Sequence, residues 1–353
     1  MTRAGTAAAM LCCAALISMP ARAQDGTGRV SVEAVASASV TSANHQPFLI
    51  FDAVGTVQLG RGWDAVVRPW ARRMNDSDWA AEMYQLQARY NSSTRVPFRI
   101  DAGIISWPIG LSTLELRADR NPTISAPFYY FAPLPAMDGR FDGKTLISGG
   151  YPLGAIVSSS GAKWDVRGGV MDSSPTHAAN VFESERPHRA VQAIAGGGIT
   201  PHPGLRLGAA VASGNYRSRV TAANGTITPA RQATVLTIEG EYAIGYTRLQ
   251  GEWIADYFDT DAGPAVARGF NVELIRTLSP RWHTAARVVR ASSPVLVGAR
   301  PGRRVASNYE ATLGYRLTRE VSLRGGYQGN ASFNNPKRVH AAAVSIVWAQ
   351  RWW

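Results

Sequence analysis

The stretch GEYAIGYTRLQGEWIADYF, residues 240–258, alternates between apolar and polar side chains. Leu249, Trp253 and Tyr257 occupy one parity. The other parity carries Arg248, Gln250, Glu252 and Asp256. Successive side chains of a β-strand point to opposite faces, so this pattern predicts strands with one apolar and one polar face. Residues 244–246 interrupt the alternation, which indicates a turn between two such strands.

The same alternation recurs along almost the whole chain, and no convincing amphipathic helix exceeds a turn or two. It predicts about sixteen strands of roughly ten residues, a length that crosses a bilayer when the strand is tilted. An even number of strands closes a barrel with both termini on one side. The apolar parity runs through residues 32–36, 49–57, 63–67, 84–90, 98–104, 147–157, 164–170, 191–199, 205–211, 236–242, 249–257, 270–274, 282–288, 309–315, 321–327 and 344–348.

The connections alternate between short and long along most of the chain. Outer-membrane barrels have short periplasmic turns and longer outside loops, whereas a soluble β-sandwich has no reason to shorten every second connection. The pattern therefore predicts an all-β transmembrane antiparallel up-and-down β-barrel. Tight turns are expected at 60–62, 92–96, 158–163, 200–204, 244–246, 279–281 and 318–320, and polar loops near 40–46, 73–79, 107–143, 173–189, 215–231, 259–266, 291–305 and 331–337.

Aromatic residues share the apolar parity and fall mostly near predicted strand ends. Amphipathic rings favour the headgroup level of a bilayer, so two aromatic girdles are expected. The residues are Trp63, Tyr84, Tyr90, Trp164, Tyr242, Trp253, Tyr257, Trp282, Tyr309, Tyr315, Tyr327 and Trp348.

The amino terminus has the features of a secretory signal peptide. An early arginine precedes a short apolar run, and Ala21-Arg22-Ala23 fits a cleavage site. We therefore assign residues 1–23 to the signal peptide and 24–353 to a single barrel domain. Cys12 and Cys13, the only cysteines, leave with the signal. The mature chain is expected to have no disulfide.

The net charge of +12 falls to +10 once the two arginines of the signal are removed. Such a basic chain can bind nucleic acid, anionic membrane surfaces or anionic solutes. Export and the absence of a lysine-rich tract or a nucleic-acid-binding motif argue against nucleic acid.

Together, these features make the chain resemble the Gram-negative outer-membrane porins, including an aromatic last residue, Trp353, after an amphipathic segment. Gln350 departs from the pattern because it falls on the apolar parity of Val344, Ile346 and Trp348. The resemblance implies a 16-stranded general or weakly anion-selective barrel in the outer membrane. It also implies contact with lipid and lipopolysaccharide, insertion by the barrel-assembly machinery, and a homotrimer.

The third long connection, residues 107–144, is far longer than its neighbours, and loops of this length tend to be functional. Residues 111–120 are expected to form about two turns of helix before several prolines. In porins the third loop folds into the lumen and narrows it, so the resemblance places Arg117, Asp119 and Arg120 at a constriction. The alternative is a loop packed on the outer rim of the barrel.

Charges of both signs fall on the predicted inner face and nearly cancel. The inward set is Arg68, Arg72, Arg89, Arg99, Arg167, Arg206, Arg248, Arg287, Arg316, Arg324, Glu33, Asp52, Asp64, Asp101, Asp165, Glu239, Glu241, Glu252, Asp256, Glu273 and Glu310. We expect ion pairs among them that keep the wall rigid and the lumen wet.

Within that set, Arg68, Arg72, Arg89, Arg99 and Asp101 precede the long connection and are predicted to line the lumen beside the constriction. Clustered arginines at a narrowing favour anions, which suggests a mild anion preference. Much of the basic excess is expected in loops and turns, where it either pairs with lipopolysaccharide phosphates or draws anions to the mouth. Arg140, Lys144, Arg217 and Arg231 belong to this group.

Catalytic and metal-binding patterns are absent from the sequence. The histidines have no GxSxG, HExxH or similar context, and only His283 falls on a clear inward strand position. We therefore expect no enzymatic activity, cofactor or metal. The predicted function is passive diffusion of small hydrophilic solutes. The alternative is a non-conducting outer-membrane barrel with a structural or adhesive role, while a transporter for apolar molecules conflicts with the polar inward positions.

Overall fold

The computed structural model describes residues 30–74, 77–92, 97–111, 117–130, 132–135, 144–176, 190–221, 224–261, 263–297 and 300–352, with the backbone alone at 220, 296–297 and 300–301. The predicted signal peptide, Arg140, Trp353 and residues 112–116 of the helix expected at 111–120 lie outside these ranges. No helix in the described ranges is long and apolar enough to cross a membrane.

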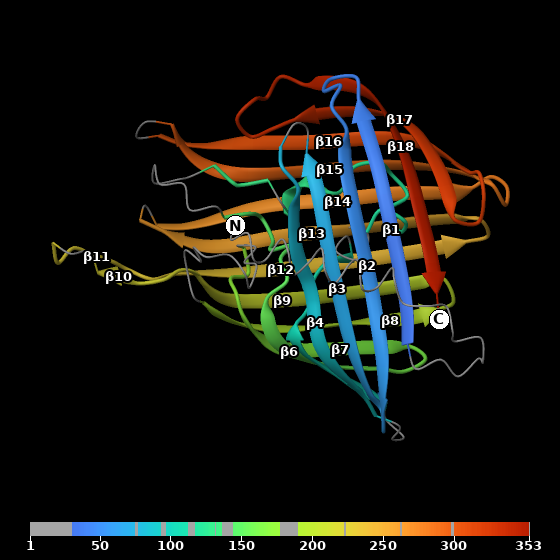
Figure 1. Cartoon of the computed structure of the whole chain (residues 1–353). Coiled ribbons are helices and arrows are strands. Elements are labelled where there is room, and N and C mark those ends of the chain that lie inside the picture. Colours follow the sequence, from blue (N-terminus) through green and yellow to red (C-terminus); the bar gives the residue numbers. More distant parts are fainter. Residues whose placement is uncertain are drawn as a thin grey trace.

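Sixteen strands of the described chain form one closed antiparallel barrel, which confirms the predicted fold class. Each barrel strand pairs with the next barrel strand along the chain, so that β9 pairs with β12, and β1 pairs with β18 to close the sheet (Figure 1). The strands are β1 (Val30–Thr41), β2 (Phe48–Gly60), β3 (Trp63–Met74), β4 (Ala80–Asn91), β5 (Phe98–Ile104), β6 (Leu153–Ser160), β7 (Trp164–Asp172), β8 (Val191–His202), β9 (Leu205–Arg217), β12 (Arg231–Ile244), β13 (Thr247–Thr260), β14 (Gly263–Thr277), β15 (Trp282–Val297), β16 (Arg300–Arg316), β17 (Val321–Ala331) and β18 (Val339–Trp352).

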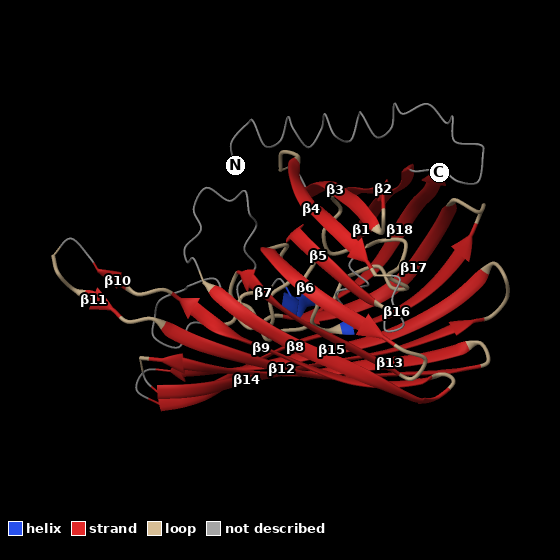
Figure 2. Cartoon of the chain, turned by 90° about the horizontal axis from the view of Figure 1, so that it is seen from below, coloured by secondary structure: helices blue, strands red, loops and turns tan. Residues whose placement is uncertain are grey.

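Two further short strands, β10 (Val220–Thr221) and β11 (Ile227–Thr228), pair only with each other. They lie between β9 and β12 and extend beyond one rim of the barrel (Figures 1 and 2). The long connection between β5 and β6 contains a short 3-10 helix, η2 (Phe128–Tyr130).

The prediction of long loops at 259–266 and 291–305 is wrong. Strands β13 and β14 stay paired to Thr260 and Gly263, and β15 and β16 stay paired to Val297 and Arg300. The regions 259–266 and 291–305 are therefore mostly strand. Their alternation is weaker because proline and glycine interrupt it, but the backbone pairing continues.

The two faces of the sheet differ as the alternation predicts. Outward side chains such as Leu86, Val166 and Ile238 are about half exposed, although they are apolar. Their neighbours Gln87 and Glu239 are buried and polar. A closed wall with an apolar exposed face and a polar enclosed face is the pattern of a barrel surrounded by lipid.

Aromatic pairs collect near the short turns on the outer face. Trp63 packs against Tyr90 with ring centroids 5.0 Å apart, and Trp282 packs against Tyr315 at 4.5 Å. These rings come from strand ends that meet at the turn end of the barrel, where a girdle is expected. In β18, Trp348 and Trp352 lie 5.9 Å apart. The register pairs Trp352 with Val32, so the last strand is paired to its end.

Candidate functional site

A row of polar side chains crosses seven neighbouring strands on the inner face. The strand register places each member directly opposite the next, so the row is continuous from β9 to β17. Its members, in order, are Arg206, Glu241, Gln250, Glu273, Arg287, Glu310 and Gln328. The alternation predicted that these side chains share one face, and the register adds that they are direct neighbours.

Arg287 is the fifth of the seven members of this row, and its side chain is completely buried. One guanidinium nitrogen lies 3.7 Å from Glu273, and another lies 3.4 Å from Glu310. The guanidinium also donates a 2.9 Å hydrogen bond to the Ser125 hydroxyl. A buried charge is costly unless it is paired and hydrogen-bonded, so these partners explain how Arg287 is tolerated in the wall.

A second ion-pair cluster lies on β7, β9 and β12. Arg206 donates to Glu239 at 2.7 Å and binds Asp165 through two nitrogens at 3.0 Å. Arg167 lies 3.6 Å from both carboxylates. Such bidentate guanidinium–carboxylate contacts fix side-chain orientation and therefore hold the inner wall in one shape.

The wall formed by β2 to β5 carries the predicted arginine ladder. Arg68 binds Asp52 through two hydrogen bonds of 2.9 and 2.5 Å. Arg89 and Arg99 share Asp101, at 2.8 and 2.7 Å. Three arginines therefore face two carboxylates on this wall. The Arg99 side chain is half exposed, which leaves it accessible from the lumen.

Aromatic rings support Arg68 from one side. Trp70, Tyr84 and Tyr151 form a stack with centroid separations of 4.5 and 4.0 Å, and the Arg68 guanidinium lies within 6 Å of both tyrosine rings. Burial raises the pKa of the Tyr151 phenol, which therefore stays neutral. Cation–π contact of this kind orients a guanidinium without neutralising it.

The prediction that Tyr84 faces outward is wrong. Arg68 pairs with Gln85, whereas the next residue, Pro69, pairs with Met83. The register therefore shifts by one residue, and Tyr84 has no register partner on β3. This β-bulge lets Tyr84 point to the same face as Gln85, against Trp70. A second correction concerns Tyr151 and Ile147, which precede β6 rather than belonging to it.

The segment between β5 and β6, residues 105–152, contacts inner-face side chains on the opposite wall. Glu310 accepts hydrogen bonds from the Ile124 and Ser125 amides at 2.5 and 3.2 Å. Arg324 of β17 donates to the Ala118 carbonyl at 2.8 Å. The described part of this segment therefore bonds to strands that lie far from its own anchors at β5 and β6.

Further along the segment, Tyr129 and Tyr130 donate to Glu252 of β13. Earlier in the segment, Arg117 forms an ion pair with Glu33 of β1 at 2.9 Å and with Asp119 at 2.7 Å. The acceptors on β1 and β13 belong to the predicted inward set. The same segment thus makes polar contacts with the inner face from β13 round to β1.

Apolar side chains fix the same segment against the middle strands. Ile109, Leu146 and Ile147 are fully buried and belong to one cluster with Val235 and Ile254 of the barrel wall. The inner face is therefore not polar throughout, contrary to the prediction, because near the loop end of these strands the inward positions are apolar. They are covered by the apolar residues of the segment, which removes both surfaces from water.

Lys144 is a related correction. We predicted a solvated loop residue, but its side chain is buried and pairs with Asp256 on β13, over the ring of Phe258 at 4.0 Å. Arg217 and Arg231 are also paired, both with Asp261 in the turn between β13 and β14. The hydrogen bond from Arg231 lowers the pKa of Asp261.

A cavity of about 440 Å³ lies between the wall of β1 to β5 and the segment 105–152. We call it the arginine-lined cavity, because among the described residues six arginines but only one carboxylate, Glu33, contribute to its lining. The arginines are Arg68, Arg89, Arg99, Arg117, Arg120 and Arg351. Asp52 and Asp101, the carboxylates that pair with Arg68, Arg89 and Arg99, are only 3% and 6% exposed and do not line this cavity, so guanidinium groups dominate its charged lining.

Five of the eight predicted site residues meet at this cavity. The other three lie nearby: Asp101 pairs with Arg89 and Arg99, Asp119 pairs with Arg117, and Arg72 lies over the ring of Trp70 at 5.1 Å. The cavity thus joins the ladder of β3 to β5 to residues of the long segment.

The lining also contains residues outside the predicted site set, among them Glu33, Tyr151 and Arg351. Glu33 carries the inward parity of β1, so its place could have been found from the alternation. Tyr151 and Arg351 gave no such signal. Tyr151 lies in the irregular segment, and Arg351 lies in the last strand, whose end the sequence leaves ambiguous.

No protein-family model matches the chain, and no curated protein sequence matches it. Solved structures do resemble it in fold. The loop-deletion form of OmpT, an outer membrane protein of Vibrio cholerae, superposes with a TM-score of 0.58 at 9% identity over 91% of this chain and 98% of that one. OmpF of Salmonella typhi in complex with daunomycin gives 0.57 at 11% identity, over 91% and 97%.

OprB of Pseudomonas putida gives a TM-score of 0.58 at 9% identity, covering 91% of this chain and 93% of that one. One of the OmpT structures is described as a trimer. At these identities the likeness shows the fold alone. The chain has the porin-like fold of outer-membrane β-barrels.

Proposed function

We propose that this chain is an outer-membrane channel for passive diffusion of small hydrophilic solutes, with a mild preference for anions. The observation that carries the proposal is the arginine-lined cavity, enclosed by a barrel whose outer face is apolar. A lipid-facing wall around a charged interior is suited to passage of hydrated solutes.

We further infer that the segment 105–152 lies within the lumen and narrows it. Its hydrogen bonds to inner-face residues on β13, β15 to β17 and β1 support this inference, as does its apolar packing against the middle strands. The remaining passage then runs along the arginines of β3 to β5, which favours anions at the narrowest part.

Conductance in planar bilayers tests the channel. Purified folded barrels should produce stepwise current, and a KCl gradient should give a reversal potential on the anion-selective side. Folded protein that inserts without current steps would contradict the channel and support the alternative of a non-conducting structural or adhesive barrel.

Charge removal tests the site separately. The double variant Arg99→Gln with Arg120→Gln should shift the reversal potential towards cation selectivity, because both residues line the arginine-lined cavity. Arg61→Gln is the control, since it removes one positive charge from the exposed turn between β2 and β3. Equal shifts in both variants would reject the assignment of selectivity to the cavity.

The same proposal includes a secretory signal peptide at 1–23, a location in the Gram-negative outer membrane and a homotrimer. The trimer is supported by the trimeric form described for the OmpT fold relative. We expect no enzymatic activity, because the sequence lacks a nucleophile and base at any recognised spacing. Cross-linking in native membranes checks the homotrimer, and hydrolase assays check the expected lack of enzymatic activity.

A further inference from the structure

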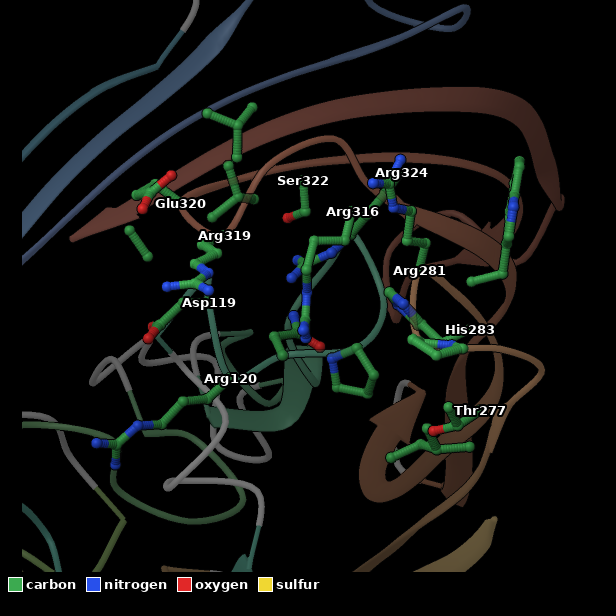
Figure 3. Close-up of a pocket in the computed structure, with 18 of the residues that line it drawn as sticks. Asp119, Arg120, Thr277, Arg281, His283, Arg316, Arg319, Glu320, Ser322 and Arg324 are labelled. Atoms are coloured by element: carbon green, nitrogen blue, oxygen red, sulfur yellow. The ribbon is translucent and has the colours of Figure 1, made fainter. Parts of the chain in front are cut away.

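A second charged cavity lies at the turn end of the barrel, beneath β13 to β18. We call it the turn-end cavity. It has a volume of about 390 Å³ and is bounded on one side by residues 119–122 and on the other by the turns at 278–281 and 317–320. Figure 3 shows side chains from these turns and strand ends gathered around it.

The lining of the turn-end cavity carries a large positive excess. Two carboxylates contribute, Asp119 and Glu320, and Asp119 is already paired with Arg117. The arginines are Arg120, Arg248, Arg281, Arg316, Arg319 and Arg324. Six guanidinium groups around two carboxylates create a strongly positive potential in a partly enclosed space.

Three of the arginines here differ from the paired arginines of the inner wall. Arg68, Arg206 and Arg287 each have a carboxylate within ion-pairing distance. In the part of the chain that the structure describes, no ion pair joins Arg316, Arg319 or Arg324 to a carboxylate. Arg316, Arg319 and Arg324 therefore bring to this cavity positive charge without a paired carboxylate among the described residues.

Arg324 differs most clearly from the paired arginines, because it has no ion pair among the described residues although it is only 6% exposed. Its hydrogen bonds go to two main-chain carbonyls, Ala118 at 2.8 Å and Thr123 at 3.3 Å, and its Nε is buried without a partner among the described residues. The Nε2 atom of His283 is likewise buried without a hydrogen-bond partner among the described residues. Buried polar atoms usually find partners, and buried charges usually find counter-charges.

We infer that the turn-end cavity binds a multivalent oxyanion of the phosphate or phosphomonoester class. Guanidinium groups bind such oxyanions through charge-assisted hydrogen bonds, and several arginines on different sides suit a tetrahedral group with oxygens in several directions. The hydroxyls of Ser279 and Ser322 line the same space and add neutral donors. This inference extends the proposed channel by naming a solute class at one mouth.

Calorimetric titration of the detergent-solubilised folded barrel with inorganic phosphate tests the inference without requiring conduction. Phosphate should bind saturably at constant ionic strength, whereas added chloride of equal ionic strength should not. The double variant Arg316→Gln with Arg319→Gln should weaken binding by at least about tenfold, because two charge-assisted contacts are lost. Folding of each variant is checked by heat-dependent gel mobility.

Arg61→Gln again serves as the control and should bind phosphate like the unmodified chain. Absence of saturable binding, or the same loss in Arg61→Gln, would overturn the inference. The outcome is separable from that of the channel: conduction without phosphate binding removes only the oxyanion site, and binding without conduction removes only the channel. With a conducting barrel, phosphate should also reduce chloride current more from one side of the bilayer.

Discussion

The contacts of single inner-face residues depend partly on partners that lie far away in the sequence. Arg287, Glu273 and Glu310 could be placed inward from the alternation alone, because cross-strand neighbours share a face. Their contact with Ser125 could not, since Ser125 lies in an irregular segment 162 residues away in sequence. The sequence therefore predicts which charges face inward but not which of them acquire a partner from the segment.

Replacing Arg287 by Ala should destabilise the barrel by about 3–5 kcal/mol, because two buried carboxylates lose their shared cation. The urea midpoint of unfolding in lipid vesicles measures this loss. Arg290→Ala on the same strand is the control: Arg290 is exposed, so its removal should change the unfolding free energy by no more than about 0.5 kcal/mol. Equal losses of unfolding free energy in the two variants would show that the ion pairs of Arg287 do not stabilise the barrel.

At the scale of elements, the turns follow local chemistry closely. Gly62 and Gly245 both have positive φ, at 83° and 53°, in two-residue turns between strands. A left-handed conformation costs an L-residue about 1–2 kcal/mol, so both positions favour glycine. They differ in their surroundings, because a Cβ on Gly62 would lie 2.4 Å from the Asn91 carbonyl oxygen, whereas Gly245 has open space.

Gly62→Ala should therefore cost clearly more than Gly245→Ala. We expect about 1 kcal/mol for Gly245→Ala from backbone strain alone. We expect a greater loss for Gly62→Ala, because the turn must move away from the end of β4. Paired unfolding curves compare the two variants, and indistinguishable midpoints would argue that the β2–β3 turn relaxes freely.

The segment 105–152 is the element that the sequence describes least. Its length indicated a functional role. Residues 112–116 of the helix expected at 111–120 lie outside the described residues, residues 117–120 form a bend and a turn, and a short 3-10 helix, η2, follows further along the segment. Prolines and mixed polarity give no period from which a contact face could be predicted. Its position depends on apolar packing with strands that are distant in sequence.

Ile147→Ala should loosen this segment. Ile147 is completely buried, and truncation of a buried isoleucine typically costs about 2–5 kcal/mol through lost burial and a residual cavity. We expect a lower urea midpoint together with larger and noisier single-channel currents. Leu153→Ala, only six positions later on the half-exposed outer face of β6, should leave the current noise unchanged. Quiet currents in Ile147→Ala would mean that other contacts fix the segment.

The whole molecule is organised by the difference between its two faces. Because the exposed apolar side chains surround a closed wall, the folded chain should remain with the membrane fraction after alkaline carbonate extraction. It should also show β-rich circular dichroism in detergent. Recovery of the processed chain in detergent-free buffer would contradict a lipid-facing barrel.

The sequence by itself determined the number of barrel strands, the face to which most side chains point and the short turns, because period-two alternation and turn chemistry are local properties. Only the tertiary structure decided where the segment 105–152 packs, that Tyr84 is turned inward by a bulge, and that Lys144 is buried against Asp256. It also separated the arginines paired within the wall from Arg316, Arg319 and Arg324, for which the described residues show no ion pair with a carboxylate. These features depend on strand register and on contacts between residues far apart in the chain, for which a single sequence carries no periodic signal.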